Sequence, residues 1–305
     1  MSKILCIHGI ANTFRSAAQL TTEWAEALQG GLDEAGGPVL AQGDLDVVAY
    51  GALFRLTHSG KGTPGQPMHA GTTEDEEAVA WEAEFIDRMW GAAAALSAQS
   101  RRAGDGDAGG EDPGIQPPGF EGKARTPLLV QRALAQLSKS RFVKAIGPSL
   151  LVSELRQVRL FLHDPSCRER ILQRMAEKVR PDTRVIIAHS LGSVVAYEAL
   201  CAHLEWEIDT LVTLGSPLGI PNLVFDALAR RARGETDLWP GVRQWVNIAD
   251  QGDLVALIKE LAPLFGPVKD VLVHNGWKAH DVTRYLGARE TGEAVAQGLA
   301  QAVSG

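Results

Sequence analysis

The sequence has few of the features that mark a metal-binding, secreted or membrane-spanning protein. It contains only three cysteines, Cys6, Cys167 and Cys201, and they show neither the Cys-x-x-Cys nor the Cys/His spacing of a metal site. No apolar run approaches the roughly 18 residues of a membrane-spanning helix. Before His8 the one apolar run is Ile4–Ile7, which is too short for the core of a signal peptide. We therefore expect a cytoplasmic protein with reduced cysteines.

The chain also lacks an excess of positive charge. Its formal net charge is −7 at pH 7, whereas a nucleic-acid-binding protein usually carries a basic face. The 45% hydrophobic and 22% charged residues are those of an ordinary soluble globular protein. We expect no nucleic-acid partner, and a chain of 305 residues fits one large α/β domain or a compact domain with a substantial insertion.

Short apolar segments alternate with longer helical patterns along much of the chain. The segments that favour strands are residues 4–8, 45–50, 183–189, 209–214, 242–248 and 267–273. The helical patterns between and after them are residues 16–35, 191–203, 222–233, 254–264 and 290–302. Several strands are apolar on both faces, which is expected where helices cover both sides of a parallel sheet.

A long segment without a convincing strand interrupts this alternation. Residues 74–97 and 128–162 have helical patterns, and residues 165–179 resemble a helix that returns to the sheet. We therefore expect a single domain over residues 1–305, with a helical insertion at 51–165. The helix at 128–162 has apolar residues at helical spacing between basic ones, so it can pack on the domain, form a lid or contact a membrane surface.

Glycine, proline and aspartate are concentrated at residues 103–119, inside this insertion. Such a composition cannot bury a core, so it predicts a flexible loop. The pair Asp105 and Asp107 is typical of calcium ligands, but the spacing does not match a calcium loop, which needs a glutamate at its twelfth position. We expect no metal there.

The fragment Ala188-His-Ser-Leu-Gly192 has the form Gly-x-Ser-x-Gly, with alanine in the first position. An apolar strand precedes it and a helix follows at once, which is the context of a nucleophile elbow. Small residues at the two outer positions relieve crowding in the sharp turn, and Ser190 is expected in a strained conformation with its hydroxyl exposed above the carboxyl edge of the sheet. The alternative is an ordinary turn with a helix-capping serine.

With this motif the chain resembles the α/β-hydrolase superfamily, specifically its lipase- and esterase-like serine hydrolases, some of which also carry Ala-His-Ser-x-Gly. Residues 4–10, Ile-Leu-Cys-Ile-His-Gly-Ile, resemble the strand and His-Gly turn before the first helix of that fold. Residues 209–217 resemble the strand after the nucleophile helix, ending in Gly-Ser-Pro. The resemblance implies an α/β-hydrolase fold with a mainly parallel six-stranded sheet of order 2-1-3-4-5-6, flanked by helices, and an insertion after the second strand.

The resemblance also implies an oxyanion hole built from the backbone N–H groups of Ile10 and Leu191. His8 is expected to fix its loop by hydrogen bonding rather than to act as a base. The residues expected to support the site are His8, Gly9, His189 and Gly192. Ser216, in the Gly-Ser-Pro turn, is expected near the site but not as the nucleophile, because no elbow precedes it.

Residues 242–255 resemble the strand and loop that carry the catalytic acid of the superfamily. Asp253, in an Asp-x-Val context, is the favoured acid, and Asp250 at the strand end is the alternative. The aspartate that is not the acid is expected to cap a helix near Leu254 or to hold the turn.

The resemblance places the catalytic base on the loop after the last strand. His280 fits this position better than His274, which still belongs to the strand end. The resulting order Ser190, Asp253, His280 is the order of this superfamily.

The expected reaction is ester hydrolysis through an acyl-enzyme, which needs no cofactor or metal. The expected partner is a small-molecule acyl ester, with transient contact to a membrane or lipid surface left open. Two alternatives share the same motifs: a thioesterase, amidase, peptidase or acyltransferase, and a non-catalytic binding protein of the same fold.

Overall fold

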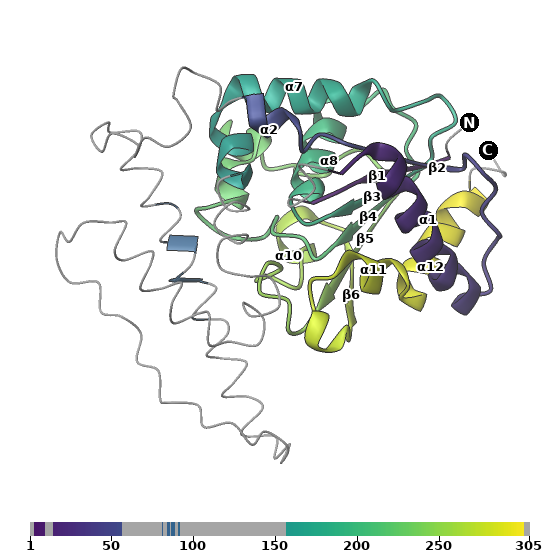
Figure 1. Ribbon diagram of the computed structural model, residues 1–305. Helices are drawn as coiled ribbons and strands as arrows, with labels where there is room; N and C mark the ends of the chain where they lie inside the picture. The colour runs from purple at the N-terminus through teal and green to yellow at the C-terminus, as the bar shows by residue number, and fades with distance from the viewer. Residues whose placement is uncertain are drawn as a thin grey trace, which may run out of the picture. The chain divides into compact units, whose positions relative to one another are not determined.

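The computed structural model describes residues 3–9, 15–56, 81, 84–85, 87–88, 91 and 157–301 (Figure 1). The chain divides into two units, one formed by residues 1–61 and 160–305 and the other by residues 62–159. In the second unit, residues 81, 84–85, 87–88 and 91 are helical, and Glu84 and Arg88 form an ion pair of 2.9 Å. The expected loop at 103–119 and most of the expected helix at 128–162 lie outside the described residues.

The larger unit is built on six parallel strands in the order β2-β1-β3-β4-β5-β6 (Figure 1). The strands are β1 Ile4–Ile7, β2 Leu45–Val48, β3 Val185–His189, β4 Thr210–Leu214, β5 Gln244–Asp250 and β6 Lys269–Val273. All six expected strands are present, and the predicted strand order is confirmed. Because every pair is parallel, the carboxyl ends of the strands meet at one edge of the sheet, where open α/β sheets place their sites.

The helices and short turns of this unit are α1 Ala17–Glu34, α2 Leu53–Leu56, α7 Pro165–Ala176, α8 Leu191–Ala202, η1 Phe225–Ala227, α9 Ala229–Ala232, α10 Ala262–Phe265, η2 Gly276–Lys278, α11 Val282–Leu286 and α12 Arg289–Gln301. The start of α1 follows from a capping box: Ser16 Oγ accepts from Gln19 N at 3.2 Å, and Gln19 Oε1 accepts from Ser16 N at 3.0 Å. The start of α7 follows from Pro165 in its first turn and from Asp164, whose carboxylate caps it.

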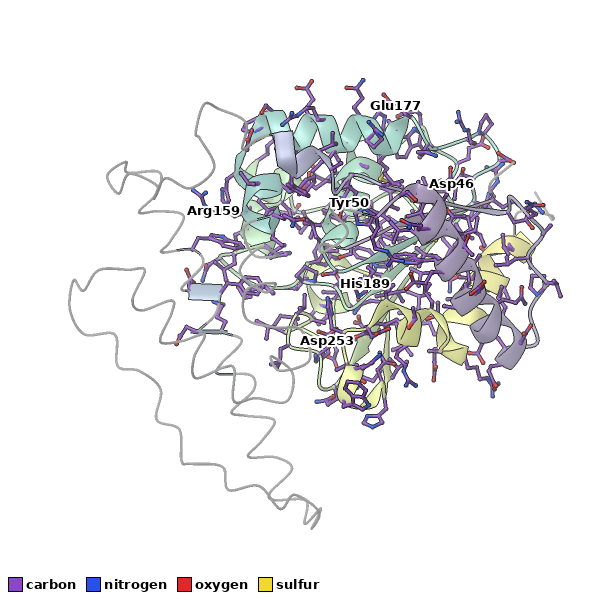
Figure 2. All side chains as sticks on the ribbon, in the orientation of Figure 1. Asp46, Tyr50, Arg159, Glu177, His189 and Asp253 are labelled. Atoms are coloured by element: carbon purple, nitrogen blue, oxygen red, sulfur yellow. The ribbon has the colours of Figure 1, made fainter. Side chains whose placement is uncertain are left out.

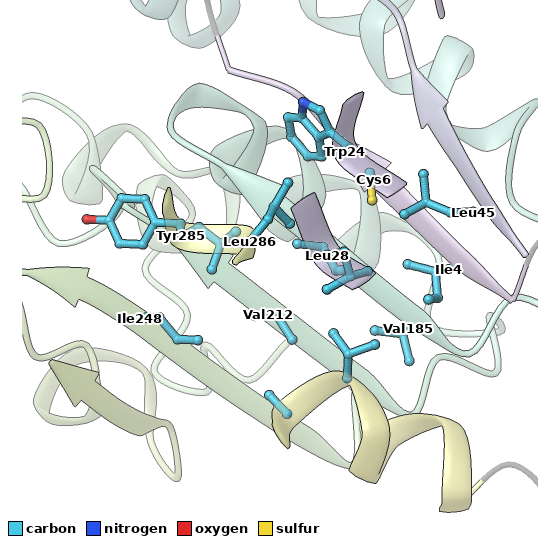
Figure 3. Packing of buried hydrophobic residues seen from close by; sticks show 14 of the residues in the cluster. Ile4, Cys6, Trp24, Leu28, Leu45, Val185, Val212, Ile248, Tyr285 and Leu286 are labelled. Carbon is cyan, nitrogen blue, oxygen red and sulfur yellow. The ribbon is translucent and has the colours of Figure 1, made fainter. Parts of the chain in front are cut away.

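Helices α1, α11 and α12 pack on one face of the sheet, and α7 and α8 lie on the other (Figure 1). The core under α1 combines alternate strand residues with one apolar stripe of the helix and with residues of α11 and α12 (Figure 3). Its buried members include Ile4, Cys6, Trp24, Leu28, Val185, Ile187, Val212, Ile248, Tyr285 and Val295. Both faces of the sheet are thus covered, as the apolar strands predict.

Two expected helices are wrong. Residues 254–261 contain no helix, and the short α10 begins at Ala262. The helix expected at 222–233 is broken into η1 and α9. In both places a carboxylate from elsewhere in the fold accepts from backbone N–H groups: Asp270 accepts from the amides of Leu261 and Ala262, and Glu198 accepts from that of Ala229.

Candidate active site

Ser190 occupies a strained turn between β3 and α8. Its backbone has φ 55° and ψ −128°, a conformation that residues other than glycine rarely adopt. A β-carbon on Gly192 would lie 2.3 Å from the carbonyl oxygen of Ile7 and 2.7 Å from that of His8. The residue two positions after the serine must therefore be glycine, whereas the buried Ala188 two positions before it is accommodated.

The side chain of Ser190 is buried, with 1% of its surface exposed. The expectation that its hydroxyl stands exposed at the sheet edge is wrong for this structure. Ser190 Oγ has no hydrogen-bond partner among the residues that the structure describes. A buried hydroxyl without a partner costs about 1–3 kcal/mol, so its retention in a strained turn calls for an explanation other than stability.

Two further serines, Ser193 and Ser216, form hydrogen bonds next to the turn at Ser190. Ser193 Oγ donates to the carbonyl oxygen of Ser190 at 2.6 Å, and the hydroxyls of Ser193 and Ser216 are 2.7 Å apart. Ser216 Oγ also accepts from the amide of Leu218 at 3.2 Å. Ser216 is buried, and its hydroxyl is engaged in this hydrogen-bond network.

Asp253 and His280 form a close hydrogen-bonded pair. His280 Nδ1 donates to Asp253 Oδ2 at 2.7 Å, since the carboxylate can only accept. The other oxygen, Asp253 Oδ1, accepts from the amides of Val255 and Ala256 at 2.8 and 3.3 Å. Burial raises the pKa of Asp253, but the charge and hydrogen bond of His280 outweigh it and hold this pKa at about 2. Asp253 is thus ionised at neutral pH.

Asp250 and His274, the two alternatives, have other surroundings. Asp250 is buried, its Oδ1 accepts from the amide of Gly252 at 2.6 Å, and its Oδ2 accepts from the amide of Asn275. Asp250 therefore ties the turn after β5 to the loop after β6. His274 lies at an exposed position next to the end of β6. The structure pairs Asp253 with His280, and it gives Asp250 a role in holding the turn.

Ser190 and the Asp253–His280 pair meet at the carboxyl end of β4. The amide of Ser190 donates to the carbonyl oxygen of Leu214 at 3.0 Å. A β-carbon on the next residue, Gly215, would lie 2.7 Å from Asp253 Oδ2 and 3.0 Å from His280 Nδ1. Gly215 has φ +55°, so the Gly-Ser-Pro turn needs glycine for its backbone conformation as well as for the space beside the pair.

His189, labelled at the end of β3 in Figure 2, connects the elbow to the loop that carries His280. Its Nε2 donates to the carbonyl oxygen of His280 at 3.1 Å, and the two rings are 4.6 Å apart. Burial, together with the nearby charge of His280, lowers the pKa of His189 to about 3. A neutral imidazole therefore packs against His280 at neutral pH.

The loop after β1 lies directly against Ser190. A β-carbon on Gly9 would be 2.7 Å from Cβ of Ser190. His8 Nδ1 donates to the carbonyl oxygen of Gly9, His8 Nε2 accepts from the amide of Tyr50 at 3.2 Å, and Tyr50 stacks on the imidazole. Burial lowers the pKa of His8 to about 4, so His8 is a neutral residue that fixes this loop.

Of the two amides expected in an oxyanion hole, one belongs to the described part of the chain. Leu191 is the first residue of α8, and its N–H is one of the first-turn amides that have no acceptor within the helix. Ile10 lies outside the described residues, so the second amide stays a prediction from the sequence.

Sequence reasoning missed Tyr285. Its hydroxyl donates to Asp253 Oδ2 at 2.7 Å and accepts from the amide of Asp250 at 2.8 Å. The sequence carries no local signal for this role, because Tyr285 reads as one apolar position of a helix and its partner is 32 residues away. Lys259 is a second residue that was missed: its ammonium donates to the main-chain oxygen of Asp253.

Two observations concern metals and membranes. Within the described ranges, no group of three or more histidine, cysteine, aspartate or glutamate side chains could hold a metal ion. In the same part of the chain, no helix is both long and apolar enough to cross a membrane.

The strand order, together with the turn at Ser190, defines the class of fold: the larger unit has the fold of the α/β-hydrolase superfamily. Residues 154–281 match the model of the PGAP1-like alpha/beta domain, a family of this superfamily that has lipase- and esterase-like members. The matched segment includes Ser190, Asp253 and His280. Searches of curated proteins and of solved structures gave no match.

Proposed function

We propose that this protein is a serine hydrolase that cleaves carboxylic esters through an acyl-enzyme on Ser190. The observation that carries the proposal is the buried, unpartnered hydroxyl of Ser190 in a strained turn next to the Asp253–His280 pair. Strain and an unsatisfied polar group both cost stability, and enzymes tolerate both at reacting centres.

In the proposed reaction Ser190 Oγ attacks the ester carbonyl while His280 Nε2 accepts the serine proton. The amides of Leu191 and Ile10 stabilise the oxyanion of the tetrahedral intermediate, each contributing up to about 3–4 kcal/mol. His280 then gives its proton to the departing alkoxide, which leaves the acyl group on Ser190. Water, deprotonated by His280, attacks the acyl-enzyme, and His280 returns this proton to Ser190 Oγ as the acid is released.

Asp253 has a defined part in this scheme. Its carboxylate accepts from His280 Nδ1, so the other nitrogen, Nε2, is left without a proton and can take one from Ser190. Because the charge and hydrogen bond of His280 hold the pKa of Asp253 below its ordinary value, the carboxylate is ionised at neutral pH and also stabilises the imidazolium formed during attack. Burial of the pair strengthens this interaction relative to water.

An ester is proposed rather than an amide because an alkoxide leaves without the demanding protonation that an amine requires. The proposed partner is a small-molecule acyl ester, and the proposed location is the cytoplasm. The preferred length of the acyl chain is left to experiment.

The test is hydrolysis of p-nitrophenyl esters from acetate to palmitate, with Ser190→Ala as the inactive variant and Ser216→Ala as its control. We expect the native protein to turn over esters and the kcat of Ser216→Ala to stay within about tenfold of the native kcat. In Ser190→Ala the kcat should fall by at least about 10³-fold. If the protein cleaves thioesters or amides but not esters, the proposed substrate class of carboxylic esters is wrong. Equal activity of Ser190→Ala and the native protein would refute the proposal.

A further inference from the structure

We infer that Tyr285 is a positioning residue that fixes the Asp253 carboxylate and limits how much of its charge acts on His280. This inference rests on the proposed function, because it concerns the same acid–base pair. It adds a fourth side chain that none of the sequence motifs indicates.

The geometry gives the hydroxyl of Tyr285 two partners. It donates to Asp253 Oδ2 at 2.7 Å, the oxygen that also accepts from His280 Nδ1 at 2.7 Å. It accepts from the amide of Asp250 at 2.8 Å. A continuous chain of hydrogen bonds therefore runs from the backbone at the end of β5, through Tyr285 and Asp253, to His280.

The direction of this chain is fixed by protonation. Burial and the charge of Asp253 raise the pKa of Tyr285 far above its usual value, so the phenol keeps its proton. The amide of Asp250 can only donate, which leaves the phenol proton for Asp253 Oδ2. A proton donor on the oxygen that faces His280 draws negative charge toward itself.

The position of the phenol is rigid for reasons unrelated to the site. The ring of Tyr285 belongs to the apolar cluster under α1, and its hydroxyl points away from that cluster (Figure 3). The carbonyl oxygen of Tyr285 accepts from Thr291 Oγ1 at 2.6 Å, which ties α11 to α12. Core packing thus holds the hydroxyl next to Asp253. The carboxylate cannot turn without breaking its hydrogen bonds to Tyr285 of α11 and to the amides of Val255 and Ala256.

Other charged or titratable groups around the carboxylate do not duplicate this contact. The ammonium of Lys259 binds the main-chain oxygen of Asp253 rather than its carboxylate. The carboxylate of Asp250 is bound by the amides of Gly252 and Asn275. His189 donates to the main chain of His280. Tyr285 is therefore the described side chain, besides His280, that donates to Asp253 Oδ2.

Removing the phenol proton has a consequence that a purely structural role would not have. In Tyr285→Phe, Asp253 Oδ2 keeps one donor, His280, and its full charge acts on that imidazole. The imidazolium form is then favoured, so His280 loses its proton at higher pH. The acid limb of the pH–rate profile should move upward by about one pH unit.

The experiment measures the rate of covalent labelling by a fluorophosphonate at pH 4 to 9, which needs no knowledge of the substrate. The matched control is Tyr197→Phe, which removes a buried phenol that donates to the carbonyl oxygen of Leu238 at 2.9 Å. Melting temperatures are measured for both variants, since each loses one buried hydrogen bond. We expect the acid limb to move upward in Tyr285→Phe and to stay in place in Tyr197→Phe.

An acid limb that stays in place or moves downward in Tyr285→Phe would overturn the inference, whatever happens to the limiting rate. An upward shift of equal size in Tyr197→Phe would also overturn it, because the shift would then be a general effect of losing a phenol. A native protein that is not labelled at any pH would instead refute the proposed function, and the inference with it.

Discussion

Replacing Asp253 by asparagine should abolish most activity while leaving the fold intact. The carboxylate of Asp253 is surrounded by donors: Oδ1 accepts from two amides, and Oδ2 accepts from His280 and Tyr285. An asparagine of the same shape must turn its NH₂ group toward one of these two sets of donors. With the backbone amides fixed by the turn, the NH₂ group should face His280.

The imidazole must then accept at Nδ1, which moves its proton to Nε2, the nitrogen that has to accept from Ser190. Loss of the correct tautomer lowers turnover by about 10⁴-fold in a trypsin-like triad, equivalent to about 5.4 kcal/mol of transition-state stabilisation. We expect a similar loss of kcat for Asp253→Asn here, measured with a p-nitrophenyl ester.

Asp250→Asn is the matched control, because Asp250 is also buried and accepts from two amides. It should lower the melting temperature by loosening the two loops, and it should lower kcat by less than about 100-fold. The reasoning is refuted if Asp253→Asn keeps more than a tenth of native kcat, or if Asp250→Asn is the more damaging variant at an equal melting temperature.

Two further predictions concern stability. Burial lowers the native pKa values of His8 and His189 to about 4 and about 3, below the ordinary 6.5, so the unfolded chain binds more protons than the native protein between these values. The free energy of unfolding should therefore be highest above pH 6.5 and fall as the pH drops to 4. In chemical denaturation His8→Asn should flatten this dependence on pH, and an unchanged slope would contradict a buried neutral His8. Gly192→Ala should lower the free energy of unfolding by about 1–3 kcal/mol or more, because the new β-carbon meets the carbonyl oxygen of Ile7. Gly30→Ala, in α1 with open space around it, should raise the free energy of unfolding by up to about 1 kcal/mol. Equal melting temperatures for the two variants would show that the turn at Ser190 is not tightly packed.

The sheet could be predicted from the sequence because its strands are apolar on both faces. Residues such as those of β3 (Val185–His189) leave few alternatives to a buried parallel strand, and the capping box at Ser16 marks the start of α1. The pairing of Asp253 with His280 could be anticipated only through the resemblance, since the two residues are 27 positions apart.

The remaining features depend on contacts between distant residues. The apolar pattern at 254–264 indicates a helix, yet Asp253 and Asp270 bind backbone amides at both ends of that segment, and the short α10 begins only at Ala262. The same reason explains why Tyr285 was missed, because only the folded chain brings its hydroxyl to Asp253. The burial of Ser190 likewise could not be read from its motif.

The most direct test of the central claim is to map the residue modified by a fluorophosphonate probe. Only an activated serine attacks phosphorus at a useful rate, so the native protein should carry one adduct, and mass spectrometry should place it on Ser190. The Ser190→Ala variant, folded to the same melting temperature, should carry none. An adduct on Ser216, or no adduct on the folded native protein, would contradict the account.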